Sequence, residues 1–367
     1  MKQVRIFTSI FLSLFFFACA TPTPLTEQQL NQAEQKELSI IQGFSDSGEY
    51  GRALSEVLAF RMAHPGTIYY QASRLVEAKT YYEMQDFNKS LEIYEDILSL
   101  GPDKYPLIWA TARYESTFVF EALGDDLKAI TTLIGLENSP SLDEEVRYAE
   151  LPARLAALYS RQGNEKETTA YLDRADRGLK YLMSRNDLNQ DRVWLAETLY
   201  RMGNLNINQL SEKNLSQQVQ SHRRLQVYLL RAIEQGVPLW SQKASEDLMQ
   251  DYQKSWSFIQ THWNKSEDRS VKVEKTKELH QLISEAMYRK PSEIKLTNQY
   301  LKNYYEFATQ LEAQVSEALF SGNDITPTSE ESVKLNDIKK KANVKATKFL
   351  PEEKRVLPKT NKKDPNL

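Results

Sequence analysis

A turn signal that recurs about every 40 residues is the feature that most constrains how this chain can fold. Its positions are Gly48, Gln85, Gly124, Gly163 and Gly203, spaced 37, 39, 39 and 40 residues apart. Each is followed by a polar residue and lies between two stretches whose apolar residues recur at helical spacing. The sequence therefore predicts a series of helical hairpins, each turning at one signal and burying its apolar face against its neighbours.

The composition agrees with a helical chain. Only 12 of 367 residues are glycine, and charged residues make up 26% of the chain. Turn-rich β-sheet proteins usually contain more glycine, so this composition favours helices. The expected fold class is all-α.

Small and aromatic residues recur at fixed places around the turns. The clearest unit places a small residue and an aromatic on its first helix, then a small residue, a large aromatic, an apolar residue and a closing proline on its second. These are Ala78, Tyr81, Ser90, Tyr94, Ile97 and Pro102. The pattern resembles the tetratricopeptide repeat, strongly in this unit and loosely elsewhere in residues 38–210. The resemblance implies a right-handed superhelix of about four to five helical hairpins, with longer helices or loops than the usual 34-residue repeat.

Beyond the repeats the helical spacing continues without a recognisable repeat. Residues 25–210 are assigned to the repeat domain and residues 211–320 to a C-terminal helical region. Residues 321–367 contain several prolines, many lysines and few apolar residues, so a disordered tail is expected. Residues 334–367 carry a net charge of +7, against −12 for residues 20–333. Two readings stay open: the tail contacts an anionic partner or its own acidic body, or it stays solvated.

The N-terminus has the pattern of an export signal in residues 1–18. Lys2 and Arg5 precede an apolar run that is shorter than the roughly 20 residues a membrane-spanning helix needs. The only cysteine, Cys19, follows Ala18 at the end of that run. This resembles the lipobox of bacterial lipoproteins, whose cysteine receives diacylglycerol, although Phe16 stands where that family usually has Leu, Val or Ile. Residues 19–24 then form a short spacer. The alternative is ordinary cleavage after Ala20, which would discard the thiol.

No constellation of catalytic or cofactor-binding residues occurs in the sequence. It contains no phosphate-binding glycine loop, no GxSxG elbow and no HExxH motif. The histidines are not spaced as ligand pairs, and one cysteine cannot form a thiolate metal site. They are His64, His222, His262 and His280. The sequence therefore predicts neither an enzyme nor a metal, cofactor or nucleic-acid binding protein.

Aromatic residues are the remaining candidates for a binding site. Adjacent aromatics cannot both face the same side of a helix, so one of each pair is expected in the core and the other on a groove. The predicted groove residues are Tyr70, Tyr82, Tyr105 and Trp109. A core position is the alternative for each of them. Arg74, Glu77, Lys79 and Glu83 are interpreted as a solvated face.

The stretch from His64-Pro65 through Asp103 resembles the periplasmic repeat lipoproteins, which include the helical lipoprotein of the outer-membrane barrel-assembly machinery. The resemblance implies a membrane-tethered scaffold that binds envelope proteins in protein assembly, secretion, motility or cell-wall machinery. Ala20 is not the Asp that retains lipoproteins in the inner membrane of enteric bacteria, which favours the periplasmic face of the outer membrane. The inner membrane and the soluble periplasm are the alternatives for location. A small-ligand binding lipoprotein serving a transporter, or a cell-wall hydrolase, are the alternatives for function.

Overall fold

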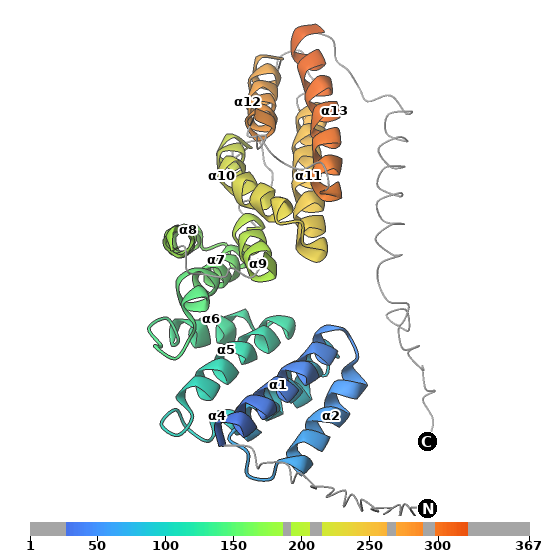
Figure 1. The fold of residues 1–367 in the computed structure, drawn as a ribbon. Coiled ribbons are helices and arrows are strands. Elements are labelled where there is room, and N and C mark those ends of the chain that lie inside the picture. The colour runs from blue at the N-terminus through green and yellow to red at the C-terminus, as the bar shows by residue number, and fades with distance from the viewer. Residues whose placement is uncertain (1–26, 186–191, 206–214, 263–268, 289–297, 322–367) are drawn as a thin grey trace, which may run out of the picture. The chain divides into compact units, whose positions relative to one another are not determined.

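The computed structural model describes residues 27–185, 192–205, 215–262, 269–288 and 298–321 (Figure 1). Regular structure in these ranges is entirely helical, which confirms the all-α prediction. The chain divides into two compact units, Met1–Arg147 (unit 1) and Tyr148–Leu367 (unit 2). The predicted signal peptide, Cys19 and the basic tail from residue 322 onward lie outside the described residues.

Unit 1 consists of three helical hairpins. The first helices of the hairpins, α1, α3 and α5, pack on one another, and each second helix packs on the first helix of the next hairpin. Neighbouring hairpins therefore cover each other's apolar faces, as stacked repeats do. The helices are α1 (Glu27–Asp46), α2 (Tyr50–Ala63), α3 (Tyr70–Glu83), α4 (Phe87–Leu98), α5 (Pro106–Ala122) and α6 (Asp126–Ile134).

Four of the five predicted turns share one backbone geometry. The residue at the signal position has a positive φ in each, and the next N–H reaches back across the turn to a carbonyl five residues earlier. This Schellman arrangement satisfies carbonyls that the end of a helix would otherwise leave unpaired. The bonds run from Glu49 to Phe44 (2.8 Å), Asp86 to Tyr81 (2.9 Å), Asp125 to Phe120 (2.8 Å) and Asn164 to Tyr159 (3.0 Å).

The polar residue of the signal caps the following helix in three of these turns. The side chains of Asp86, Asp125 and Asn164 each accept a hydrogen bond from the backbone N–H three residues later. Such a cap pairs one of the free donors at the start of a helix. The recurring two-residue signal is therefore a helix stop followed directly by a helix start.

Gln85 is the one non-glycine residue with a positive φ in the described chain, at 63°. The left-handed conformation costs an L-residue about 1–2 kcal/mol because its Cβ crowds the following carbonyl. Gln85→Gly is therefore expected to raise the free energy of unfolding by up to about 1 kcal/mol, measured by urea unfolding. Gly124→Ala, at φ 79°, is the matched reverse change and should lower it. A stability loss in Gln85→Gly would contradict this account.

The fifth signal, at Gly203, also ends a helix, and α10 packs against α9 as expected of a hairpin, but its backbone geometry differs from that of the other four. Gly203 is the buried last residue of α9 and lacks a positive φ, and the N–H of Asn204 makes an ordinary helical bond to Tyr200. A Cβ built on Gly203 would lie 2.6 Å from Cγ of Leu229. This glycine therefore permits α9 and α10 to approach closely, which is a tertiary requirement that the local sequence does not reveal.

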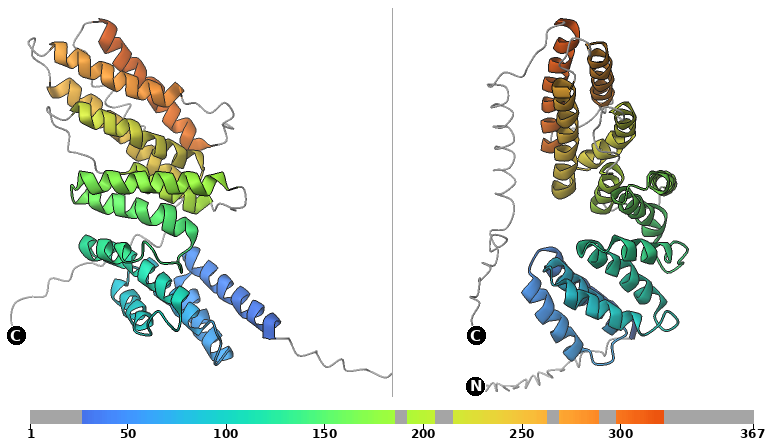
Figure 2. Two further views of the ribbon diagram at one scale, coloured as in Figure 1. Left: turned by 90° about the vertical axis from the view of Figure 1, so that its left-hand side faces the viewer. Right: turned by 180° about the vertical axis from the view of Figure 1, so that it is seen from behind.

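Unit 2 contains a fourth hairpin, α7–α8, followed by the short helix α9 and by four helices of 20 to 25 residues that pack on one another (Figure 2). A single apolar cluster runs from α7 to α13, through α9 and α10. The two compact units divide between Arg147 and Tyr148, and the predicted boundary at residue 210 lies within unit 2. The assignment of residues 25–210 to one repeat domain stays a prediction. The helices are α7 (Leu151–Arg161), α8 (Glu165–Ser184), α9 (Arg192–Gly203), α10 (Leu215–Glu234), α11 (Pro238–His262), α12 (Arg269–Tyr288) and α13 (Gln299–Ser321).

Candidate functional site

Three of the four predicted groove aromatics lie at one end of unit 1. Tyr70 begins α3 and is exposed, with the Arg61 guanidinium 5.5 Å from its ring centre. Tyr105 is the residue before α5, and Trp109 lies one turn further on. The Trp109 indole N–H donates a 3.1 Å hydrogen bond to the carbonyl of Leu98 at the end of α4. Trp109 therefore also caps the C-terminal end of α4.

Tyr82 lies at the other end of α3, twelve residues or about 18 Å along the helix from Tyr70. It is half-buried, and its ring centre is 5.8 Å from that of Phe87 and 6.3 Å from that of Phe118. The four aromatics are consequently not brought together into one groove. Their role in partner binding stays a prediction.

A different set of residues meets where the first helices of the hairpins pack side by side. Lys79 on α3 donates a 3.0 Å hydrogen bond to Asp46 at the end of α1. The charges of Glu83 on α3 and Glu115 on α5 also act on Lys79. The rings of Tyr82 and Phe118 lie on the same two helices, α3 and α5. The name first-helix surface is used below for Asp46, Lys79, Tyr82, Glu83, Glu115 and Phe118.

The carboxylates of the first-helix surface determine the charge state of its lysine. Burial by itself would lower the pKa of Lys79, but the bond to Asp46 and the negative charges of Asp46, Glu115 and Glu83 outweigh it and raise that pKa. Lys79 therefore stays protonated at neutral pH and neutralises one of three carboxylates. The surface keeps a net negative charge beside two aromatic rings.

A buried aromatic ring supports the aromatic part of this surface. Phe118 packs edge to face against the buried Tyr114, with ring centres 5.6 Å apart. Such ring pairs are favourable beyond the area that they bury. Because Phe118 and Tyr82 are both half-buried, each ring exposes part of its apolar area while the rest packs against neighbouring rings.

The negative charge of the protein is concentrated in unit 1. Residues 27–147 contain 21 Asp and Glu against 10 Lys and Arg, a net charge of −11. Residues 148–333 contain 25 against 24, a net charge of −1. An excess of this size in one unit attracts cationic partners and repels anionic ones. Almost all of the net charge of −12 in residues 20–333 therefore comes from residues 27–147.

The interpretation of one charged set on α3 as a solvated face is wrong for three of its members. Each reaches a different neighbouring helix: Arg74 pairs with Asp96 on α4 at 2.7 Å, Glu77 with Arg61 on α2 at 2.6 Å, and Lys79 with Asp46 on α1. Charge spacing along one helix cannot show this, because the partners lie on three other helices, α1, α2 and α4. For the same reason, the sequence did not predict the first-helix surface, whose residues come from α1, α3 and α5.

Three of the histidines pair with carboxylates on adjacent helices. His64 lies 2.9 Å from Glu37 and 3.4 Å from Glu34, His222 lies 3.7 Å from Asp251, and His280 lies 2.8 Å from Glu312. The fourth, His262, stacks on the ring of Phe258. Within the described ranges, no group of three His, Cys, Asp or Glu side chains could hold a metal ion. His64, His222 and His280 therefore link neighbouring helices, whereas His262 contacts a ring of its own helix, α11.

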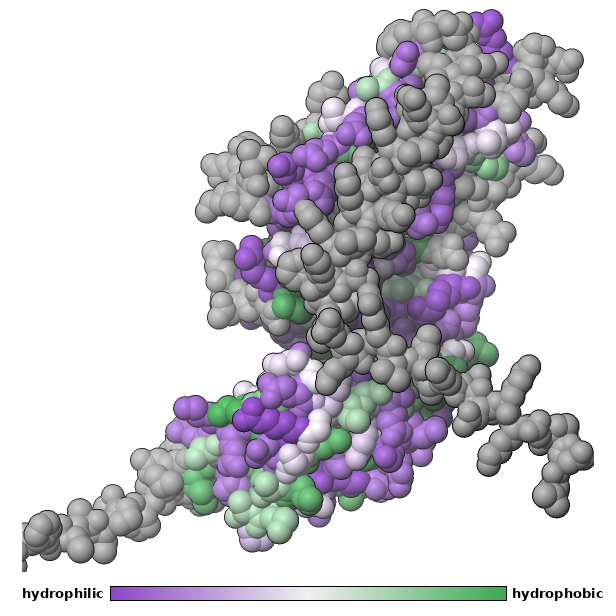
Figure 3. All heavy atoms as spheres, turned by 90° about the vertical axis from the view of Figure 1, so that its right-hand side faces the viewer, coloured by the Kyte–Doolittle hydropathy of each residue, from purple (hydrophilic) through white to green (hydrophobic). Residues whose placement is uncertain are grey.

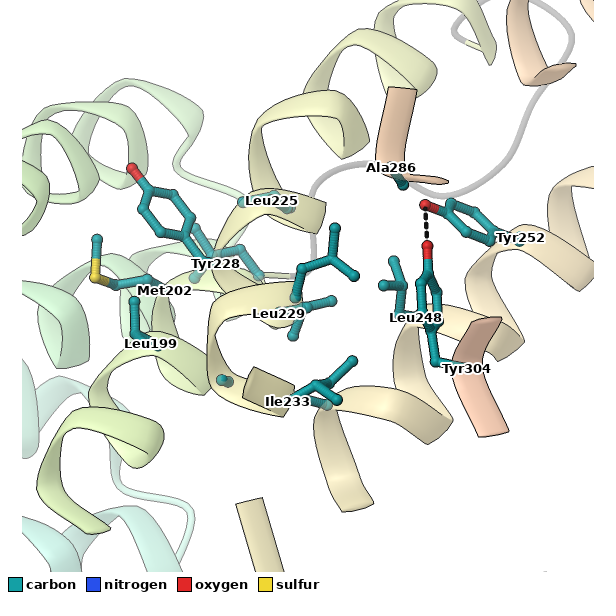
Figure 4. Close-up of a cluster of buried hydrophobic side chains, with 14 of the residues drawn as sticks. Leu199, Met202, Leu225, Tyr228, Leu229, Ile233, Leu248, Tyr252, Ala286 and Tyr304 are labelled. Carbon is teal, nitrogen blue, oxygen red and sulfur yellow. Dashed lines mark hydrogen bonds between the residues drawn. The ribbon is translucent and has the colours of Figure 1, made fainter. Parts of the chain in front are cut away.

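Unit 2 contains a polar network inside its apolar core (Figure 4). The hydroxyl of Tyr252 donates to Oε1 of Gln226 at 2.6 Å and lies 3.5 Å from the hydroxyl of Tyr304. Burial raises the pKa of Tyr252 well above its usual value, so the hydroxyl remains a donor. Because all three side chains are buried, the network links α10, α11 and α13 and offers no surface to a partner.

Among the described helices, none is both long and apolar enough to cross a membrane. No family model matches the chain, and no curated protein matches it. A crystal structure of a tetratricopeptide repeat protein from Parabacteroides merdae is similar to 76% of this chain and 99% of its own, at 13% identity and a TM-score of 0.34.

Proposed function

We propose that this protein is a membrane-tethered periplasmic scaffold that binds other proteins of an envelope complex. Support for the location comes from the export pattern of residues 1–18 and from the one cysteine, Cys19, at its end. Diacylglycerol on Cys19 would anchor the chain at the periplasmic face of the outer membrane. The complex would serve protein assembly, secretion, motility or the cell wall.

The observation that carries the binding function is the first-helix surface of unit 1. It combines three carboxylates around one lysine with the partly exposed rings of Tyr82 and Phe118. Aromatic rings supply contact area at low entropic cost, and a negative field selects cationic partners and speeds their encounter. We therefore propose that the bound segment is basic and carries apolar side chains for the two rings.

Reversing the charge of this surface should weaken partner binding. In Glu83→Lys/Glu115→Lys, two carboxylates become cations within residues 27–147, whose net charge is −11. Loss of two close charge contacts is expected to reduce the binding free energy by about 1.5–3 kcal/mol. The measurement is affinity for the protein recovered with the wild-type chain from solubilised membranes, at low and high salt. The difference from wild type should shrink at high salt because the interaction is screened.

The matched control is Glu92→Lys/Glu95→Lys. Both residues are exposed on α4, the second helix of the same hairpin, and the change in net charge is identical. Melting curves of both variants should match wild type, so that binding is compared between folded proteins. Equal loss of binding in the two variants would show that only total charge matters and would reject the first-helix surface as the site.

A further inference from the structure

Large apolar side chains are exposed at one end of unit 1. They come from the end of α2, from the starts of α3 and α5, and from the connections α2–α3 and α4–α5. The set, called the loop end below, is Met62 (76% exposed), Ile68 (68%), Tyr70 (45%), Leu100 (39%) and Leu107 (56%). In the view of Figure 3, the surface of unit 1, in the lower part of the picture, carries several apolar patches among hydrophilic residues. A concentration of this kind usually marks an interaction surface.

Two contacts between helices place these residues at the same end of unit 1. The Arg74–Asp96 ion pair holds the start of α3 beside the end of α4. The Trp109 indole bond to Leu98 holds the start of α5 beside the same helix end. Tyr70, Leu100 and Leu107 therefore come from neighbouring helix ends.

The start of the described chain lies at this end as well. Thr67, in the α2–α3 connection, donates a 2.5 Å hydrogen bond to Glu34 in the first half of α1. His64 in the same connection lies 2.9 Å from Glu37. Glu27, the first residue of α1, therefore lies towards the loop end of unit 1. Eight residue steps separate Cys19 from Glu27, which span at most about 28 Å when fully extended.

We propose that the loop end docks on the surface of the lipid bilayer beside the anchored Cys19. This inference rests on the proposed lipid anchor, which would hold the loop end within reach of the membrane. Exposed Met, Ile and Leu side chains gain free energy on entering the interfacial region, and tyrosine favours that depth. Residues 27–147 carry a net charge of −11, which repels anionic headgroups. The contact is therefore apolar, and a bilayer of zwitterionic lipids should bind the loop end best.

Docking in this way would orient the proposed binding surface. Asp46 is the last residue of α1 and Glu83 the last residue of α3, so both lie at the opposite end of these helices from the loop end. The bilayer contact would therefore leave the acidic end of the first-helix surface pointing away from the membrane. Anchor and loop end would act together, because a second attachment restricts the rotation that a single tether allows.

The experiment uses the mature chain Cys19–Leu367 made without lipid. Its only thiol, Cys19, is coupled to a maleimide phospholipid in phosphatidylcholine vesicles. Hydrogen exchange is then compared between tethered and free protein. Amide exchange in residues 64–70 and 99–107 is expected to slow on tethering, whereas exchange in the turns at 47–49, 84–86 and 123–125 stays unchanged. Protection that spreads equally over both ends, or none at either, overturns the proposal.

A pair of variants isolates the apolar contact. Met62→Ser/Ile68→Ser is expected to reduce the vesicle-induced protection about tenfold, because two exposed side chains lose their transfer free energy. Leu123→Ser/Leu127→Ser removes two comparably exposed apolar side chains, 51% and 68%, at the opposite end. That control should keep full protection. Equal loss in both variants, or slowing that depends on protein concentration without vesicles, would point to protein contacts and overturn membrane docking.

Failure of this inference is distinguishable from failure of the proposed function. The chemical tether places the chain on vesicles whether or not cells lipidate Cys19. Lipid labelling in cells, with Cys19→Ala as the control, tests the anchor itself. Unprotected loops with a positive label would reject membrane docking alone, whereas an absent label would reject the anchored location.

Discussion

Tyr94→Ala is expected to lower the free energy of unfolding of unit 1 by about 3–5 kcal/mol, the cost typical of truncating a large core side chain. Tyr94 is 1% exposed and lies in a cluster with Ala78, Ile97, Ala112 and Val119 from three helices. Removing the ring would leave a cavity where two hairpins meet, because α3, α4 and α5 all contribute to its lining. The measurement is urea unfolding of the full chain followed by far-ultraviolet circular dichroism.

Asn88→Ala is the control for this prediction. Asn88 is exposed on the same helix, so the substitution removes no core contact and should change stability by less than about 0.5 kcal/mol. Tyr94→Phe keeps the ring and should recover most of the stability lost in Tyr94→Ala. If Tyr94→Ala unfolded at the same urea concentration as Asn88→Ala, the packing of this hairpin would have to be reassigned.

Gly178→Ala should destabilise unit 2 by about 3 kcal/mol, at the upper end of ordinary overpacking costs. A Cβ built on Gly178, in α8, would lie 1.8 Å from the carbonyl oxygen of Tyr148 and 2.5 Å from its carbonyl carbon. These are backbone atoms of the π-helical turn Val146–Glu150, so rotation of a side chain cannot relieve the clash. The helices would have to separate, and the loss would appear as a lower melting temperature.

The same substitution at Gly43 should have the opposite sign. Gly43 lies inside α1, and a Cβ there would meet nothing within 4 Å. Alanine in an open helical position stabilises by about 0.5–1 kcal/mol because it reduces the freedom of the unfolded chain and favours the helix. A stabilised Gly178→Ala, or equal effects at the two positions, would show that α8 does not approach Tyr148 closely.

Much of the fold was predictable because its causes are local. The stop and start of consecutive helices depend on residues at most five positions apart, as in Asp86 and Tyr81 or Asp125 and Phe120. The small and aromatic residues of the clearest unit were likewise predictable as core, since helical spacing alone puts Ala78 and Tyr94 on buried faces. Tyr81 of the same unit is only half-buried, with the Lys89 ammonium 5.1 Å from its ring centre.

The candidate sites were less predictable because they are made by residues from different hairpins. Lys79 was recognisable as a charged residue on a helix, yet only packing of α1, α3 and α5 brings Asp46 and Glu115 to it. The sequence singled out Tyr70 but not Met62 or Leu107, because exposure depends on what the neighbouring helices leave uncovered.

The sequence by itself determined that this chain folds into helical hairpins and where four of their turns lie, because turn and capping bonds are formed within a few residues. Only the tertiary structure decided that Gly203 and Gly178 serve close helix contacts, that the compact units divide after Arg147, and which charges and apolar side chains remain at the surface. Glycine in a turn and glycine at a helix crossing are identical as letters. They differ in the neighbour that a Cβ would meet, and that neighbour lies 26 residues from Gly203 and 30 residues from Gly178 along the chain.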